Sequence, residues 1–230
     1  FLTATALSQW TTSDAAPAVL GDNANAQVLP KIAATSDGGC YIGWYDNATG
    51  GYDVYLQRLD RMGNELWAHN GVLLADRSFS SNQDWDLEVD SNDNAFVAFN
   101  DDRLGSAICV TKVSPAGVQL WGANGIQLNP TGFLGPPKLA MLTNGTIGVA
   151  FSIDNTMRWQ MLATNGAVLG TWNLSETGKP LAVSDIAPGA NGSMVLLYVR
   201  RFNSNINSAK ALWAQCYDAN GAGLWNAGSP

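Results

Sequence analysis

Short apolar runs alternate with tight polar turns along the whole chain, and the same succession occurs four times. In each unit an apolar run leads into a turn of Asn, Asp or Gly, residues that accept the positive φ of hairpin turns. A second run follows, at residues 40–44, 95–99, 147–151 and 194–198. These second runs are almost continuously apolar, which predicts strands buried on both faces.

A third run follows a variable polar loop and alternates between apolar and polar residues. It covers residues 53–59, 108–113 and 212–217, and the alternation predicts half-exposed strands. A turn that contains Gly63, Gly117, Gly166 or Gly221 then leads toward a tryptophan. We therefore expect a fourth strand around that tryptophan in each unit.

The tryptophans mark a repeat of about 50 residues. Trp10, Trp67, Trp121, Trp172 and Trp225 lie 57, 54, 51 and 53 residues apart. Four short antiparallel strands per unit at this period predict an all-β fold, a β-propeller of four-stranded blades. A β-sandwich is the alternative, but it does not require such regular self-similarity.

The repeat predicts about four full blades plus a partial one. The units are residues 30–83, 84–134, 135–182 and 183–230, each with its own tryptophan strand. Residues 1–29 form an N-terminal segment, in which 9–20 predict an extra strand. The chain is then a piece of a larger ring, a four-blade ring with an added edge strand, or an assembly completed by another chain. Residues 1–9 resemble the rear of a signal peptide, and an ordinary apolar strand explains them equally well.

Composition narrows the environment and the partners. Charged residues make up only 13% of the 230 residues, a balance common in secreted and cell-surface β-proteins. We expect an extracellular, periplasmic or cell-surface location. The net charge of −7 disfavours nucleic-acid binding, and no apolar run reaches transmembrane length. Cys40, Cys109 and Cys216 predict buried free thiols.

Candidate catalytic groups are few. His69 is the only histidine and falls in a predicted surface turn, so a zinc site of His and Cys and a Ser-His-Asp triad are both disfavoured. Acidic residues gather at Asp84, Asp86, Glu88, Asp90 and Asp93. The alternation of Asp86, Glu88 and Asp90 predicts a solvated strand edge, with a Ca²⁺ site in the cluster as the alternative.

A glycoside hydrolase needs two carboxylates across a pocket. Asp46 and Asp101 begin equivalent loops in two units, but Ile153 and Arg200 take that place in the others. We therefore expect no catalytic residues. Trp85, Trp159 and Trp213 lie outside the recurring tryptophan position; stacking on sugars is open to them, but core packing is the expectation.

One stretch resembles a known repeat. Residues 52–67 read YDVYLQRLDRMGNELW, with Asn70-Gly71 behind them, and are similar to "DIYAQRVDxxGxxxWxxNG" units of secreted bacterial proteins. Residues 35–46 are similar to the "SDGxGGxxxxWxD" string that precedes those units. The resemblance is close only in the first two units. It implies an exported propeller and no defined activity.

These observations together predict a non-enzymatic propeller that binds a protein partner or serves in a larger assembly, with no cofactor. Glycan binding is the second choice, and glycoside hydrolysis is the third. Binding would fall on the variable loops after the second strands. The candidate residues there are Asp46, Asn47, Tyr52, Asp101, Asp102, Arg103, Arg200, Arg201 and Asn203.

Overall fold

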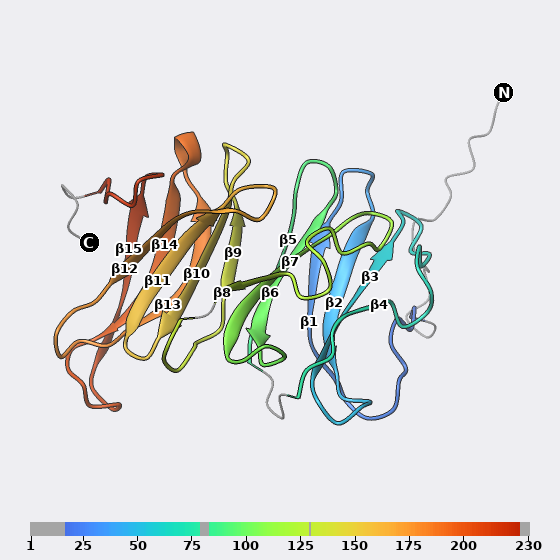
Figure 1. Cartoon of the computed structure of the whole chain (residues 1–230), viewed down its shortest axis with the longest axis horizontal. Coiled ribbons are helices and arrows are strands. Elements are labelled where there is room, and N and C mark those ends of the chain that lie inside the picture. Colours follow the sequence, from blue (N-terminus) through green and yellow to red (C-terminus); the bar gives the residue numbers. More distant parts are fainter. Residues whose placement is uncertain (1–16, 79–82, 129, 226–230) are drawn as a thin grey trace.

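The computed structural model describes residues 17–78, 83–128 and 130–225, which form four antiparallel sheets that follow one another along the chain (Figure 1). We call the sheets blades 1 to 4. Blade 1 contains β1 (Gln27–Ala34), β2 (Cys40–Asp46), β3 (Asp53–Leu59) and β4 (Val72–Ala75). Blade 2 contains β5 (Asp86–Val89), β6 (Ala95–Asp101), β7 (Ala107–Val113) and β8 (Ile126–Leu128). Blade 3 contains β9 (Lys138–Met141), β10 (Ile147–Ile153), β11 (Thr156–Leu162) and β12 (Val168–Leu174). Blade 4 contains β13 (Leu181–Pro188), the 3₁₀ turn η1 (Ala190–Gly192), β14 (Met194–Arg201) and β15 (Lys210–Tyr217).

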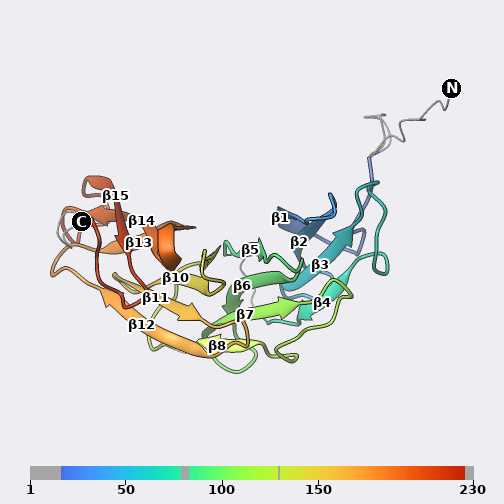
Figure 2. The ribbon, with the colours of Figure 1, turned by 90° about the horizontal axis from the view of Figure 1, so that it is seen from above.

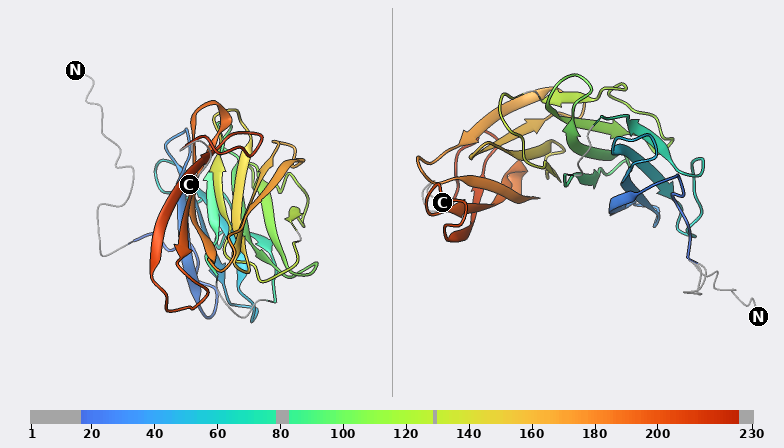
Figure 3. Two further views of the ribbon diagram at one scale, coloured as in Figure 1. Left: turned by 90° about the vertical axis from the view of Figure 1, so that its left-hand side faces the viewer. Right: turned by 90° about the horizontal axis from the view of Figure 1, so that it is seen from below.

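The blades stand side by side in a propeller-like arc. Figures 2 and 3 show the first strands of the blades on the concave side and β4, β8 and β12 on the convex side. Contacts join β1 to β5, β5 to β9 and β9 to β13, so these inner strands run around a common axis. The described part of the chain forms an open arc, because blades 1 and 4 lie at opposite ends (Figure 2).

The hydrophobic core is divided among the spaces between blades. Strand β6 is buried along its whole length, as its apolar run predicts. Phe99 packs in the cluster shared with blade 1, while Phe96 packs in the cluster shared with blade 3. Burying one such side chain stabilises the fold by roughly 1.5–3 kcal/mol before entropy costs. Each blade therefore depends on its neighbours.

The turn chemistry and most strand predictions are confirmed. The turns between first and second strands use positive φ at Gly38, Asp93, Gly145 and Asn191. The prediction of half-exposed third strands is wrong for β3, where only Tyr55 and Arg58 are not buried, and for β7, where only Lys112 is not buried. Alternation of residue types fails in β7 because blades cover both of its faces.

The recurring tryptophans connect consecutive blades. Trp67 donates its Nε1–H to the carbonyl of Pro115 in blade 2 at 3.1 Å, and its ring lies against Gly117. A Cβ built on Gly117 would lie 3.2 Å from that ring. Trp121 meets Gly166 and Trp172 meets Gly221 in the same manner. The tryptophan of one blade thus packs on the turn glycine of the next.

The position of the fourth strands corrects one prediction. Strands β4 and β8 begin five residues after Trp67 and Trp121, and only β12 contains its tryptophan, Trp172. The residues before β4 and β8 bend so that each indole ring reaches the following blade. In blade 4 the described residues contain three strands and no fourth, and Trp225 is 44% exposed.

The predicted extra strand at residues 9–20 lies mostly outside the described residues. Residues 17–20 are not a strand, and the rest of the predicted extra strand, 9–16, lies outside the described residues. None of the described residues forms a helix long and apolar enough to cross a membrane. The three cysteines are buried and free, as predicted.

Candidate functional site

Strand register places four charged side chains at the same point of the four inner strands. Lys31, Asp86, Lys138 and Asp185 each pair with the fourth residue of the neighbouring second strand. Those partners are Gly43, Ala98, Ala150 and Leu197. Lysine and aspartate therefore alternate around the axis on the concave side of the arc.

Two residues further along the inner strands, one position differs from the other three. Glu88 pairs with Phe96 in blade 2, whereas Ala33, Ala140 and Ala187 occupy the equivalent places. Alanine leaves room where a longer side chain would reach inward. Glu88 is therefore the single acid at this level, and three small residues accompany it.

Asp84 is held by two lysines from the blades on either side. Lys31 Nζ lies 2.9 Å from its Oδ1, and Lys138 Nζ lies 2.6 Å from its Oδ2. Burial alone would raise the pKa of Asp84, but the hydrogen bonds from Lys138 and Lys31 outweigh burial and lower it. Asp84 is thus a fixed anion that joins three inner strands.

Glu88 has the opposite electrostatic surroundings. Burial raises its pKa, the nearby charges of Asp86 and Asp185 raise it further, and the value reaches about 7. Its carboxyl group therefore holds a proton in mildly acidic solution. A carboxyl group that is neutral near pH 7 can act as a proton donor.

The two neighbouring aspartates differ in access. Asp86 accepts the backbone N–H of Leu139 at 2.8 Å, and burial raises its pKa. Asp185 is exposed, and its Oδ1 accepts the N–H of Ile186 at 2.9 Å. Burial alone would lower the pKa of Lys138. The hydrogen bond and the negative charge of Asp84 have the larger combined effect, so the pKa of Lys138 is raised. The site therefore combines a neutral acid, an accessible carboxylate and a fixed cation.

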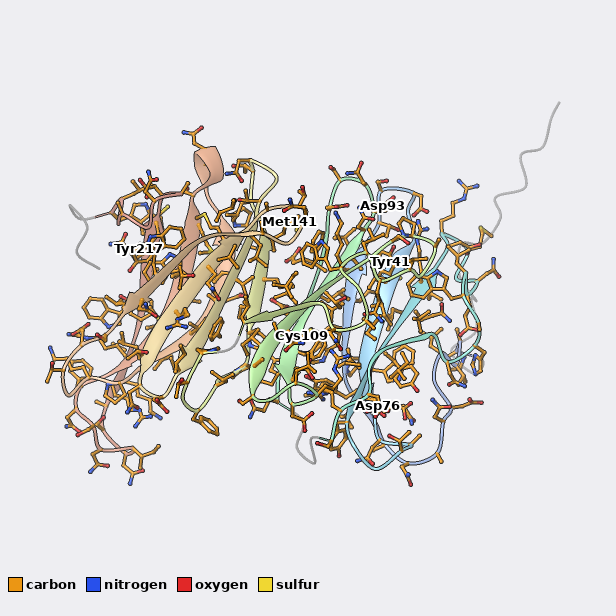
Figure 4. The ribbon with its side chains drawn as sticks, viewed as in Figure 1. Tyr41, Asp76, Asp93, Cys109, Met141 and Tyr217 are labelled. Atoms are coloured by element: carbon orange, nitrogen blue, oxygen red, sulfur yellow. The ribbon has the colours of Figure 1, made fainter. Side chains whose placement is uncertain are left out.

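The predicted binding loops lie at the other end of the blades. Glu88 is two residues from Asp90, where the turn of Asp93 begins, whereas Asp101 ends β6. Glu88 pairs with Phe96. Asp101 lies five positions further along β6 than Phe96, which corresponds to about 17 Å along the strand. Figure 4 shows Asp93 and Met141 at one end of the blades and Asp76, beside the loops, at the other.

Asp46 and Asp101, the two predicted hydrolase carboxylates, are buried within their own blades. Asp46 is 1% exposed and accepts hydrogen bonds from Asn23 and from the N–H of Ala48. Asp101 is fully buried and pairs with Arg103 at 2.8 Å. Burial alone would raise the pKa of Asp101, but hydrogen bonds from Arg103 and Gln127 lower it. Both carboxylates hold loops in place.

An open hollow between blades 1 and 2 brings together some of the other candidates. Asp102 and Arg103 line it, together with Asp76. Arg77, also in its wall, is 2% exposed and donates to the carbonyls of Tyr52 and Asn100. The neighbouring Asn47 is half-buried at the end of β2. This hollow is polar and distant from Glu88.

The candidates in blade 4 form a separate group. Arg200 pairs with Glu176 and lies 4.6 Å from the centroid of the Trp213 ring. Arg201 is half-buried, and Asn203 is exposed in the following loop. They therefore share an end of the blades with the other loops but do not join the hollow.

His69 is exposed and lies between Glu65 and Asp22, as a surface residue. Trp85 and Trp159 are buried, and Trp213 is partly buried. In the described residues, no group of three or more His, Cys, Asp or Glu side chains is arranged to hold a metal ion.

The acidic run of β5 was wrongly interpreted as a solvated edge. Glu88 and Asp86 are half-buried at the axis, and Asp86 bonds to β9. One signal could have identified Glu88: it is the one acid in a register position otherwise held by Ala33, Ala140 and Ala187. That register becomes visible only after the bulges in β1 and β13 are placed.

Comparisons with known proteins identify the fold. No family model matches the chain, and no curated protein matches it. Among solved structures, the chain is similar to an endo-1,4-β-xylanase from Bacteroides thetaiotaomicron, with a TM-score of 0.50 and 10% identity. It is similar to a thermostable family-43 glycoside hydrolase with a TM-score of 0.50 and 13% identity. Each alignment covers 89% of this chain and 76% of the other.

These comparisons correct the functional prediction. The expected non-enzymatic binding or assembly module is contradicted, because this fold is shared with glycoside hydrolases. The prediction was drawn from the loops, where Asp46 and Asp101 do not converge. The carboxyl groups of Glu88 and Asp185, whose charges interact, come instead from inner strands of the second and fourth blades.

Proposed function

We propose that this chain is a glycoside hydrolase whose active site lies on the concave side of the arc, with Glu88 as general acid. One observation carries the proposal. The pKa of Glu88 is raised to about 7 by burial and by Asp86 and Asp185, in a register position where the other three blades carry alanine. A propeller-like fold shared with glycoside hydrolases supports it.

Hydrolysis of a glycosidic bond needs a proton donor on one side of the bond and a carboxylate on the other. Protonated Glu88 would give its proton to the oxygen of the leaving sugar. Asp185 is exposed and comes from another blade, so it is our candidate for the carboxylate. It would stabilise the developing positive charge and either activate water or attack the sugar carbon.

The remaining charges position this pair. Asp86 keeps the pKa of Glu88 high, and its bond to the N–H of Leu139 fixes its side chain. Lys31 and Lys138 hold Asp84, which ties blades 1, 2 and 3 together beneath Glu88. We assign these residues positioning roles.

The partner is accordingly a carbohydrate. Xylan is the first polysaccharide to test, because one similar structure is an endo-1,4-β-xylanase. We retain export as part of the proposal, on the low share of charged residues. Three points remain predictions: the resemblance to secreted bacterial repeats, the unit boundaries, and the count of four full blades plus a partial one.

The test is sugar release from a panel of plant and bacterial polysaccharides, xylan included. If Glu88 is the acid, Glu88→Gln should lower kcat by about 10²–10⁴-fold, the usual contribution of a general acid. The matched control is Glu65→Gln, at a blade 1 glutamate that binds His69 far from the axis.

Circular dichroism should show both variants folded. Equal loss of rate in both variants, or full activity in Glu88→Gln, would contradict the assignment of Glu88. No sugar release from any polysaccharide by the wild type would contradict the hydrolase proposal itself.

A further inference from the structure

The free face of blade 4 is built like an interior face. On β14, Met194, Leu196 and Tyr198 point toward blade 3 and are fully buried. The alternate residues Val195 and Leu197 point the other way and are only partly buried. They line a mostly apolar hollow of about 220 Å³ with Ile186 and Ala187, and Asp185 lies at its wall. This outward surface has no neighbouring blade among the described residues.

The equivalent surfaces of the other blades are all covered. Tyr41 of blade 1, Phe96 of blade 2 and Ala150 of blade 3 point toward the following blade. Each of them is fully buried. In blades 1, 2 and 3, the face equivalent to this surface of blade 4 is therefore covered by the following blade.

The opposite end of the arc presents the matching kind of face. On blade 1, Ile32 is 68% exposed and pairs with the partly buried Ile42. The equivalent pair in blade 2, Leu87 and Val97, is buried against blade 1. Ile42 also lines a hollow of about 340 Å³ with Pro30 and Trp44, and residues 18–21 of the same chain line its other side, where Gly21 lies against the Trp44 ring. Among the described residues, only segment 18–21 covers part of this apolar face, and no blade precedes it.

We propose that the free face of blade 4 binds the free face of blade 1 of a second copy of this chain. Side-chain sizes support this pairing. Between blades 1 and 2, Gly43 receives the ring of Trp85, and a Cβ there would lie 2.6 Å from it. At the new contact, the larger Leu197 stands in place of Gly43, and the smaller Pro30 stands in place of Trp85.

Charges at the axis support the same pairing. Lysine and aspartate alternate from Lys31 to Asp185 across the four inner strands. A second copy next to blade 4 places its Lys31 beside Asp185, so the alternation continues. Like charges would meet if two blade 4 faces were joined, because each would bring Asp185.

The tryptophan connection provides a third argument. Three tryptophans pack on the turn glycine of the following blade, and Trp225 is the next in this series. Its 44% exposure contrasts with the partly buried Trp67, Trp121 and Trp172. In the proposed contact Trp225 meets the turn of Gly63 in the second copy.

The first test measures mass in solution by light scattering across protein concentrations. The wild type should form a dimer, which closes a ring, or longer head-to-tail chains. Leu197→Asp should weaken association at least tenfold, because it places a charge in the apolar face. The control Leu104→Asp changes a loop leucine that is 58% exposed and should leave association unchanged.

The second test identifies the two faces. A chain with Ile32→Cys is mixed with a chain with Leu197→Cys and treated with a short bifunctional maleimide. Cross-linking of the two different chains is expected, while the buried Cys40, Cys109 and Cys216 should leave the wild type unlinked.

A wild type that stays monomeric at about 100 μM would overturn the proposal. Cross-linking within a monomeric chain that carries both Thr5→Cys and Leu197→Cys would also overturn it, since residues 1–16 would then be the occupant of the blade 4 face. The proposal does not depend on the hydrolase assignment, because neither test measures sugar release.

Discussion

Blades 2 and 4 have similar apolar second strands but different neighbours. All seven residues of β6 are buried, whereas β14 alternates between buried and partly buried residues. Blade 2 lies between two blades, and blade 4 has a described neighbour on one side. Their inner strands also differ, since blade 2 carries Glu88 where blade 4 carries Ala187.

The difference shows that residue pattern and environment are separate properties in a repeat fold. The apolar run of β14 is as long as that of β6, so composition alone does not reveal which blade is covered. The position of a blade in the arc determines how far its side chains are buried, and burial changes the pKa of an acidic side chain such as Glu88. The pKa of Glu88 is raised by burial between blades and by the charges of Asp86, on its own strand, and Asp185, in blade 4.

The largest expected effect concerns the core. Phe96→Ala removes a fully buried ring between blades 2 and 3, so the free energy of unfolding should fall by about 3–5 kcal/mol. Val195→Ala at the equivalent place in blade 4 should cost less than about 1 kcal/mol in dilute protein. Urea unfolding followed by tryptophan fluorescence measures both. Equal losses would show that blade 4 is as well covered as blade 2.

A smaller effect is expected from exchanging side-chain size. Ala98 is fully buried, and Ala98→Leu gives blade 2 the residue that blade 4 has at that position. Overpacking should destabilise the protein by about 1–3 kcal/mol. Leu197→Ala, the reverse change, should be close to neutral in the same urea titrations. Tolerance of the larger side chain at position 98 would contradict tight packing between blades 2 and 3.

The smallest effect concerns pH. The pKa of Glu88 is about 7 in the folded protein, compared with an ordinary value of 4.5. Between these values the unfolded chain has lost a proton that the folded chain keeps, so this residue makes stability fall as pH rises. Glu88→Gln should flatten that part of the pH profile of thermal unfolding. An unchanged slope would show that the carboxyl group is not perturbed.

Much of the fold could be predicted from the sequence. The boundaries of β3 at Asp53 and Leu59 follow from its alternation, and the turns follow from Asn, Asp and Gly. Trp67 and Trp121, which mark the predicted repeat, pack between blades. Turns and strand patterns depend on neighbouring residues, and the tryptophans recur in each repeat. Both types of feature can therefore be recognised in the sequence.

The candidate site could not be predicted in the same way. Alternating acids on β5 look the same whether the strand faces solvent or the axis of a propeller. Only the pairing of Asp86 with Ala98 and of Asp185 with Leu197 shows that two distant aspartates share one position. A bulge between Val183 and Asp185 shifts that register, and the sequence gives no sign of it.

The contact between each tryptophan and the next turn has a mechanical consequence. Trp172 grips the turn of Gly221 in blade 4, and a Cβ there would lie 2.1 Å from its ring. Because each blade is held only by the blades next to it, a pulling force should peel the arc from a free end. Blade 4 would detach first, while the ion pairs of Asp84 with Lys31 and Lys138 still hold blades 1 to 3 together.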